Sequence, residues 1–265
     1  MQVQSDHNYY RIEMKPQAKW LWDHAIYLFL GGLAGAVYAI AGISMLFFNP
    51  VNWAGFAQTG IYLAFPAGIA ASAALFMGLG SPMKAVHSWK KPGTSWIARG
   101  VFIWTIFLGV AFIHFITLLL GIDIGGLNNV LFLVGTIAGF GIMVYTGFLL
   151  SAARAIAFWS TGALPALFLV GALASGFLAL IFFGALTGVE GGEKGWLFVR
   201  YGALTMLGLQ AFITLFHIQA THSSPEGRVS ANLLMKGERS ALFWGGAVIL
   251  GLAVPLLLLS VAAGS

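Results

Sequence analysis

Seven apolar stretches dominate this chain, and each is long enough to cross a lipid bilayer as a helix. They span residues 24–48, 56–79, 96–120, 127–150, 162–186, 195–218 and 240–262. The hydrocarbon core of a bilayer is about 30 Å thick and requires roughly 20 apolar residues in an α-helix. The stretches lack the short alternating pattern of a transmembrane β-strand. The sequence therefore predicts an all-α integral membrane protein, a bundle of about seven transmembrane helices.

Composition agrees with this class of protein. Of the 265 residues, 59% are hydrophobic and only 8% are charged, whereas soluble domains carry about 25% charged residues. The first twenty residues are polar, with no apolar core or cleavage site, so they do not form a cleaved signal peptide. No tandem repeat, linker or soluble domain stands out. We expect one transmembrane domain over residues 1–265, with residues 1–20 as a polar cytoplasmic segment.

Cysteine is absent from the sequence. The protein therefore cannot form disulfides, thiolate zinc sites or iron–sulfur clusters from its own residues. Any iron–sulfur centre would belong to another subunit, and we expect no metal site in this chain. The net charge of +5 is no evidence for nucleic-acid binding, because basic residues in membrane proteins mainly set topology.

The basic residues lie mostly on one face of the predicted bundle. Lys194 and Arg200 fall on the other face. The remaining eleven of the thirteen are Arg11, Lys15, Lys19, Lys84, Lys90, Lys91, Arg99, Arg154, Arg228, Lys236 and Arg239. The positive-inside rule then places the amino terminus in the cytoplasm and indicates a multi-pass protein of the cytoplasmic membrane. Because the connections over 81–95 and 219–239 are long and basic, we expect soluble partners on the cytoplasmic side.

Protonatable side chains from distant spans fall at one depth, near the predicted cytoplasmic boundary. One of them, Tyr145, lies about six residues, or roughly 9 Å, from the end of the fourth span. A quinone headgroup requires hydrogen-bond partners for both oxygens and groups that exchange protons, so this depth is a candidate quinone site. Its residues are Asp23, His24, Tyr27, Tyr145, Arg154 and His217.

Each candidate also has a purely structural interpretation. Tyr27 and Tyr145 could belong to the aromatic belt at the membrane interface. His24 could cap the first helix, and His217 could be an interfacial residue. Arg154 could serve only as a topology determinant or as a phospholipid contact.

The polar residues of the spans leave other functions open. His114 lies deep in the outer half of the third span, where it either hydrogen-bonds a neighbouring helix or belongs to a proton path. One haem held by His24 and His217 remains an open alternative. A second haem would require another pair of histidines, which His114 alone cannot supply. The spans hold no deep Asp or Glu, which disfavours a proton-driven small-molecule carrier and indicates proton exchange with the cytoplasmic side. A purely structural anchor also remains open.

Several segments, in order along the sequence, resemble the NrfD family, the membrane subunits of polysulfide reductase-like complexes. The most informative is YTGFLLSAARAIAFWSTGALPALFLVGALASG at Tyr145–Gly176. FLGGLAGAVY in the first span, SWIARGVFIW at Ser95–Trp104 and LLMKGERSALFWGGAVILGLAVPLLL at Leu233–Leu258 add to it. Together these segments cover most of the chain.

The resemblance implies a subunit that binds menaquinone or ubiquinone but holds no haem or iron–sulfur cluster of its own. Its partners would be an iron–sulfur subunit and, through it, a molybdopterin or tungstopterin catalytic subunit. This subunit would not act on the soluble substrate alone but would form the quinone-reactive site. The resemblance places Tyr145, His24 and Tyr27 at the quinone. At the position of Tyr27, members of the family can carry a histidine instead. Many members have eight or more spans, so an eighth span remains open. Many also serve catalytic subunits outside the cytoplasmic membrane, whereas the charge bias here favours the inside.

Overall fold

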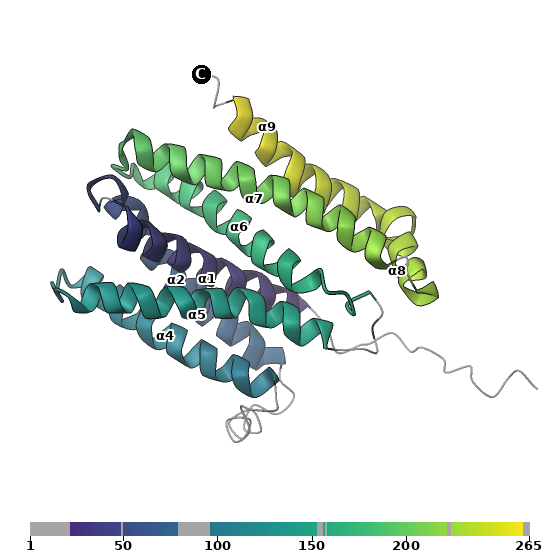
Figure 1. The fold of residues 1–265 in the computed structure, drawn as a ribbon, viewed down its shortest axis with the longest axis horizontal. Coiled ribbons are helices and arrows are strands. Elements are labelled where there is room, and N and C mark those ends of the chain that lie inside the picture. The colour runs from purple at the N-terminus through teal and green to yellow at the C-terminus, as the bar shows by residue number, and fades with distance from the viewer. Residues whose placement is uncertain are drawn as a thin grey trace, which may run out of the picture.

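The computed structural model describes residues 22–48, 50–78, 96–152, 156, 158–221 and 224–261. Over these ranges every regular element is helical (Figure 1). The elements are α1 (Trp22–Phe47), α2 (Pro50–Gly78), α4 (Trp96–Leu119), α5 (Leu127–Ser151), α6 (Leu164–Thr187), α7 (Gly192–Thr221), α8 (Pro225–Lys236), η2 (Leu242–Ala253) and α9 (Val254–Val261). The predicted polar segment 1–20 lies outside the described residues.

Seven helical spans in the described residues are long and apolar enough to cross a membrane. Six are single helices, and the seventh, Leu242–Val261, joins the π-helical segment η2 to α9. The prediction of a seven-span all-α membrane bundle is therefore confirmed. Two details differ from it. The second span's helix begins earlier, at Pro50, and the predicted basic connection over 219–239 contains the short helix α8.

Helix α8 forms because its first residues carry strong start signals. Ser224 precedes the helix and its side chain accepts a hydrogen bond from the Gly227 backbone N–H at 3.0 Å. Pro225 follows at the first helical position, where its missing N–H costs nothing. These start signals are local, and a search for long apolar spans does not detect them.

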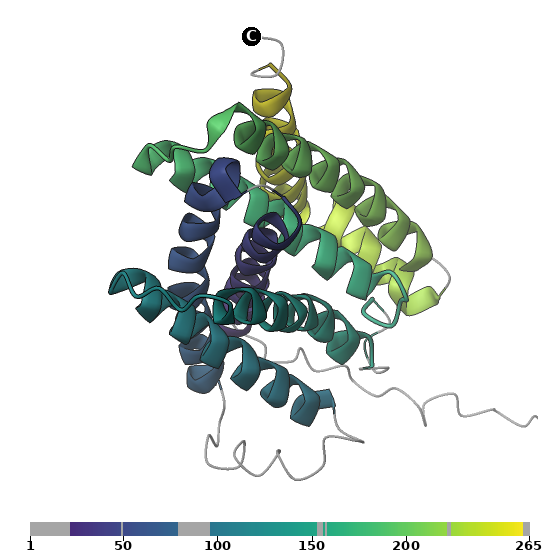
Figure 2. The same ribbon diagram turned by 60° about the vertical axis from the view of Figure 1, so that its left-hand side comes forward.

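Helix α1 runs through the middle of the bundle, between α2, α5 and α6 (Figures 1 and 2). Helix α4 packs outside α5, and α7 packs against α6. In the most apolar part of α1, 61% of residues are buried, against 6% in the last span. The last span therefore lies at the edge of the bundle, beside α7, and α1 forms its core.

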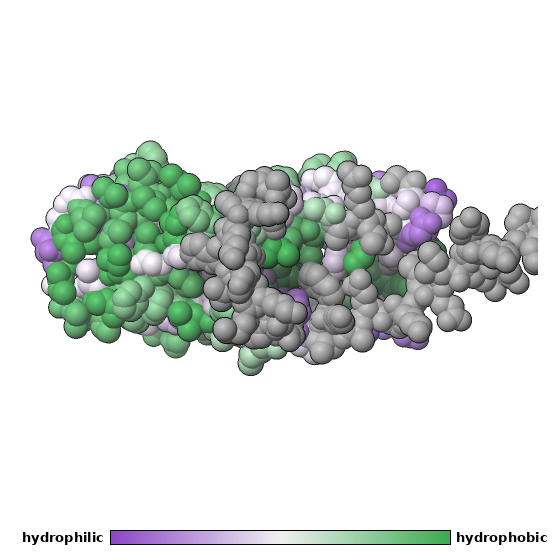
Figure 3. All heavy atoms as spheres, turned by 90° about the horizontal axis from the view of Figure 1, so that it is seen from below, coloured by the Kyte–Doolittle hydropathy of each residue, from purple (hydrophilic) through white to green (hydrophobic). Residues whose placement is uncertain are grey.

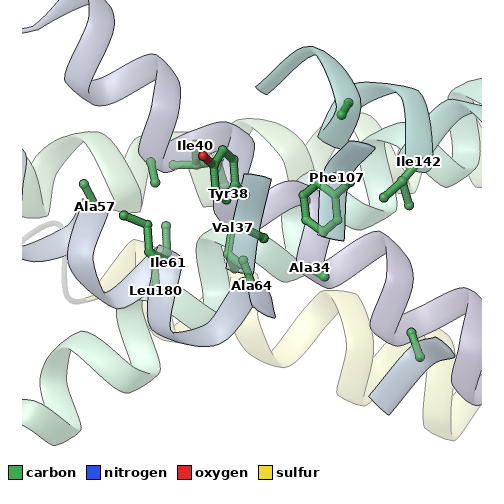
Figure 4. Packing of buried hydrophobic residues seen from close by; sticks show 14 of the residues in the cluster. Ala34, Val37, Tyr38, Ile40, Ala57, Ile61, Ala64, Phe107, Ile142 and Leu180 are labelled. Carbon is green, nitrogen blue, oxygen red and sulfur yellow. The ribbon is translucent and has the colours of Figure 1, made fainter. Parts of the chain in front are cut away.

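A backbone crossing between α1 and α5 holds the centre of the bundle together. A Cβ added to Gly35 would lie 2.7 Å from the Gly139 carbonyl oxygen, and the reverse is equally true. Glycine at both positions lets the two helices touch through their backbones, which is the role expected of small residues in membrane bundles. Around this crossing Ala34, Val37 and Ile142 are fully or almost fully buried (Figure 4).

The outer surface is suited to lipid. Large apolar side chains such as Phe212, Leu215 and Phe216 are exposed on α7. On the face shown in Figure 3, hydrophobic residues cover most of the visible described surface, and hydrophilic residues gather toward its two ends. We call the end where α1 and α4 begin and α5 and α7 finish the proximal end, and the opposite end the distal end.

Candidate functional site

Two of the predicted site residues meet inside the bundle near the proximal end. Tyr27 on α1 and Tyr145 on α5 belong to the same buried core cluster. Trp104 on α4 joins them, since its indole N–H donates a hydrogen bond to the Tyr27 hydroxyl at 3.2 Å. The Tyr27 and Trp104 ring centroids are 5.8 Å apart. We call Tyr27, Trp104 and Tyr145 the tyrosine cluster.

Glycines one helical turn away make room for these rings. A Cβ on Gly100, one turn before Trp104, would overlap the ring of Tyr145. A Cβ on Gly31, one turn after Tyr27, would come within 2.9 Å of the Trp104 indole. Residues four apart lie on one face of a helix, so each glycine opens a space beside an aromatic residue of the cluster.

The tyrosine cluster is buried. Tyr27, Trp104 and Tyr145 are only 5%, 8% and 7% exposed, whereas belt aromatics lie at the membrane–water interface. The two tyrosines therefore do not face lipid, as exposed aromatic-belt residues would. Because the cluster is packed closed, a ligand headgroup can reach the Tyr145 hydroxyl only if the ring moves.

Asp23 and His24 form a pair of their own at the start of α1. Nδ1 of His24 lies 3.0 Å from a carboxylate oxygen of Asp23, and both side chains are about one-fifth exposed. The carboxylate accepts, so Nδ1 is the donor of this bond. The pair lies about one helical turn before Tyr27, closer to the proximal end. It offers a partly exposed acid and imidazole beside the buried cluster.

The structure places His217 in a separate group of contacts. Its Nδ1 lies 2.8 Å from the Thr161 hydroxyl, and its ring packs edge-on against Phe158 with centroids 5.0 Å apart. Within the described residues, Nε2 of this buried histidine has no hydrogen-bond partner. Thr161 and Phe158 belong to the connection between α5 and α6. Arg154, predicted in the same connection, lies outside the described residues.

Sequence reasoning missed one part of the polar interior, Trp104, and anticipated another, His114. Trp104 was noted only as the last residue of the segment SWIARGVFIW and was not predicted as a site residue. No sequence spacing links it to Tyr27. His114 was expected to bond a neighbouring helix or to join a proton path, and the first is confirmed. Its Nδ1 lies 2.6 Å from the Tyr38 hydroxyl on α1, and its Nε2 lies 2.6 Å from Oδ1 of Asn128 on α5. Tyr38 is eleven residues from Tyr27, roughly 16 Å along the helix.

Comparison with known proteins agrees with the architecture. The C subunit of polysulfide reductase from Wolinella succinogenes is 27% identical over 277 aligned residues, which cover 93% of this protein and 84% of the relative. No solved structure matches the sequence. The family described as "Polysulphide reductase, NrfD" matches residues 11–263. A match over nearly the whole length, together with the seven-span helical bundle, shows that this chain belongs to the NrfD family.

Proposed function

We propose that this protein is the quinone-binding membrane subunit of a multi-subunit respiratory oxidoreductase. It exchanges electrons between a docked iron–sulfur subunit and menaquinone or ubiquinone in the membrane. The iron–sulfur subunit serves a molybdopterin or tungstopterin catalytic subunit. Family membership supports this proposal, as does the name of the Wolinella relative, which is one subunit of a polysulfide reductase.

The tyrosine cluster is the observation that carries the proposal. Buried hydroxyl groups from α1 and α5 and an indole N–H from α4 converge at one depth of a membrane bundle. Polar groups inside a membrane are costly and mark functional sites by default. Reduction of a quinone takes two electrons and two protons, and its oxygens require hydrogen-bond donors. The Tyr145 hydroxyl would donate to one quinone oxygen, while Trp104 holds Tyr27 in place.

The neighbouring groups fit the accompanying proton exchange. Asp23 and His24 are partly exposed near the proximal end, where they can take protons from water and pass them toward the cluster. A headgroup would enter by turning the Tyr145 ring away from Gly100, the glycine that gives it space. Among the described residues, Nε2 of the buried His217 has no hydrogen-bond partner, and we keep His217 and Arg154 as further candidate contacts for the quinone.

The proposal also assigns the soluble subunits to one side of the membrane. Among the described residues, Arg99, Arg228, Lys236 and Arg239 lie in helices or connections at the proximal end, and the order of the spans in the sequence assigns seven more basic residues to the same side. The positive-inside rule puts this end in the cytoplasm, so the soluble subunits would dock there. Helix α8, which carries Arg228 and Lys236, would be part of the docking face.

The geometry weighs against a haem near the distal end. Both ring nitrogens of His114 are bonded to protein groups, Tyr38 and Asn128, so this histidine has no free nitrogen for iron. A small-molecule carrier, the other alternative, would have to work without a partner subunit. Co-purifying subunits therefore test the carrier alternative, and the visible spectrum tests the haem alternative.

The first test is purification of the tagged protein from its own membranes in mild detergent. We expect iron–sulfur and molybdopterin or tungstopterin subunits to co-purify, with about one extractable quinone per complex and no haem absorption in the visible spectrum. Recovery of the protein alone, without quinone and with substrate flux in vesicles, would replace the proposal with a carrier. A haem spectrum would replace it with a cytochrome-type anchor.

The second test is Tyr145→Phe in the purified complex. Loss of one positioned proton donor typically slows a reaction by about 100-fold or more, so we expect quinone turnover to fall on that scale while the complex stays assembled. Tyr62→Phe is the matched control, because Tyr62 is exposed near the middle of α2 and packs against Phe115. Equal turnover in the two variants would leave only a structural anchor.

A further inference from the structure

A second polar group lies in the distal half of the bundle, apart from the tyrosine cluster. It consists of Tyr38, His114 and Asn128, which we call the histidine network. Tyr38 is completely buried and His114 is 2% exposed. Figure 4 shows Tyr38 among apolar core residues, with Phe107 nearby. The Tyr38 hydroxyl also lies 3.1 Å from the Leu131 carbonyl oxygen on α5.

With the Asn128 oxygen facing His114, the three contacts of this network require one more hydrogen than neutral His114 and Tyr38 supply. Three close contacts need a donor each: Nε2 to Asn128 Oδ1, Nδ1 to the Tyr38 oxygen, and the Tyr38 hydroxyl to Leu131. A neutral imidazole has one N–H and a tyrosine has one O–H, which makes two hydrogens. Doubly protonated His114 supplies the third. With Oδ1 of Asn128 facing Nε2, all three contacts are satisfied together only in that state. If the amide turns so that its NH₂ group donates to Nε2, neutral His114 satisfies all three, so the Asn128 amide can serve either protonation state.

In the orientation with Oδ1 of Asn128 facing Nε2, the neutral state is also accommodated, at the loss of one bond. The Tyr38 hydrogen then points to Nδ1 of His114, while Nε2–H still donates to Asn128. The Leu131 carbonyl belongs to α5, where carbonyl groups accept backbone bonds within the helix. Uptake of a proton therefore requires only that the Tyr38 hydrogen turn from His114 to Leu131.

The network has a route to water at the distal end. A pocket of about 200 Å³ is lined by both His114 and Asn128, together with Gln58, Thr117 and Asp123. The titratable groups that face His114 across this pocket or contact it in the described residues are Asp123 and Tyr38. Gln58 on α2 and Asn128 on α5 do not titrate near neutral pH. The exposed carboxylate of Asp123 favours a positive charge at the inner wall of the pocket.

We propose that the histidine network is a buried proton-accepting site that exchanges protons with the distal face of the membrane. The proton comes from water in the pocket, its charge rests on the imidazolium of His114, and the Tyr38 hydroxyl changes acceptor. Phe107 separates this site from the tyrosine cluster, since its ring packs edge-on against both Tyr38 and Trp104, at 5.7 Å and 6.2 Å. The distal site therefore acts in addition to proton exchange at the proximal end and does not depend on quinone binding.

The test is nitrogen NMR of the full-length protein, with ¹⁵N-labelled histidine, in lipid bilayers over a range of pH. The ring signals distinguish an imidazole with one N–H from one with two, and His114→Gln assigns the signal. We expect His114 to gain its second N–H as the pH is lowered. His217 serves as an internal comparison for His114, because Nε2 of His217 has no acceptor among the described residues, whereas Nε2 of His114 contacts Asn128. A His114 that stays neutral at every pH at which the protein is folded overturns the proposal.

Tyr38→Phe tests the switch itself and preserves the shape of the core. Removal of the hydroxyl leaves Nδ1–H of the imidazolium without an acceptor. The neutral state also loses its bond to Tyr38, but a hydrogen bond to a charged group is the stronger of the two, so the protonated fraction at a given pH should fall several-fold. Tyr62→Phe is the matched control and should titrate like the unaltered protein. If Tyr38→Phe also titrates like the unaltered protein, the hydroxyl is no part of the site.

The distal route is tested by filling the pocket. Gln58 lines the pocket from an exposed position on α2, so Gln58→Trp should slow deuterium exchange at the His114 ring several-fold. Thr59→Trp, on the same helix but lining only a neighbouring groove, is the control and should leave exchange unchanged. Equal exchange rates in the two variants would show that protons do not enter through this pocket.

Discussion

Gly100→Ala is the most direct perturbation of the tyrosine cluster. The added Cβ would overlap the ring and hydroxyl of Tyr145, so the ring or helix α4 must shift. Gly109→Ala, on the same helix, adds the same atom where nothing lies within 4 Å. The pair separates the effect on Tyr145 from the general effect of replacing a glycine in α4.

The magnitudes follow from helix propensity and packing. Alanine is about 1 kcal/mol better than glycine inside a helix, so Gly109→Ala should be neutral or slightly stabilising. An overpacked core loses roughly 1–3 kcal/mol, so Gly100→Ala should range from neutral to about 2 kcal/mol less stable. Its larger effect is local, since a headgroup contact weakened by the roughly 1–3 kcal/mol of overpacking lowers quinone affinity by roughly 5- to 150-fold.

The assay has two readouts on the purified complex. Thermal unfolding in detergent reports stability, and quinone titration of turnover reports the site. We expect Gly100→Ala to lose quinone affinity while it remains folded, and Gly109→Ala to retain both. The reasoning fails if Gly100→Ala binds quinone as well as Gly109→Ala does, because the Tyr145 ring would then have no part in binding.

Two further predictions concern the rest of the bundle. Gly139→Ala places a Cβ against the Gly35 carbonyl, which cannot yield like a side chain, so relative to an unobstructed Gly→Ala change thermal unfolding should show a loss of about 1–3 kcal/mol. Gly208→Ala, in open space, is its control, and equal stability of the two would contradict the backbone crossing. Thr161→Val removes the Nδ1 partner of His217 and should cost about 1–3 kcal/mol, as expected for a buried polar group left unpaired. If His217→Phe costs the same alone and together with Thr161→Val, the bond is confirmed; additive losses would contradict it.

Much of the fold was predictable because its causes are local in sequence. Long apolar stretches predict membrane helices from length alone, and all seven are present. The close contact between Gly35 and Gly139 is of the kind that small residues make between membrane helices. By contrast, α8 was missed because its cap at Ser224 lies within a connection whose most conspicuous feature is its basic charge.

The site was only partly predictable. Depth along each span placed Tyr27 and Tyr145 at one level, because rise per residue is constant in a helix. Depth says nothing about which face of a helix meets which neighbour. For that reason His217, at a similar depth, was grouped with the tyrosines but lies with Thr161 and Phe158 instead.

The sequence alone determined that this protein spans a membrane as a seven-helix bundle, and where along each span its polar groups fall. Both follow from the thickness of the hydrocarbon core and the cost of exposing polar groups to it. Only the tertiary structure decided the partners: Trp104 with Tyr27, and His114 with Tyr38 and Asn128. These pairs depend on how helices distant in sequence are rotated about their axes and how closely they cross. That rotation is set by packing of the whole bundle, which no single segment encodes.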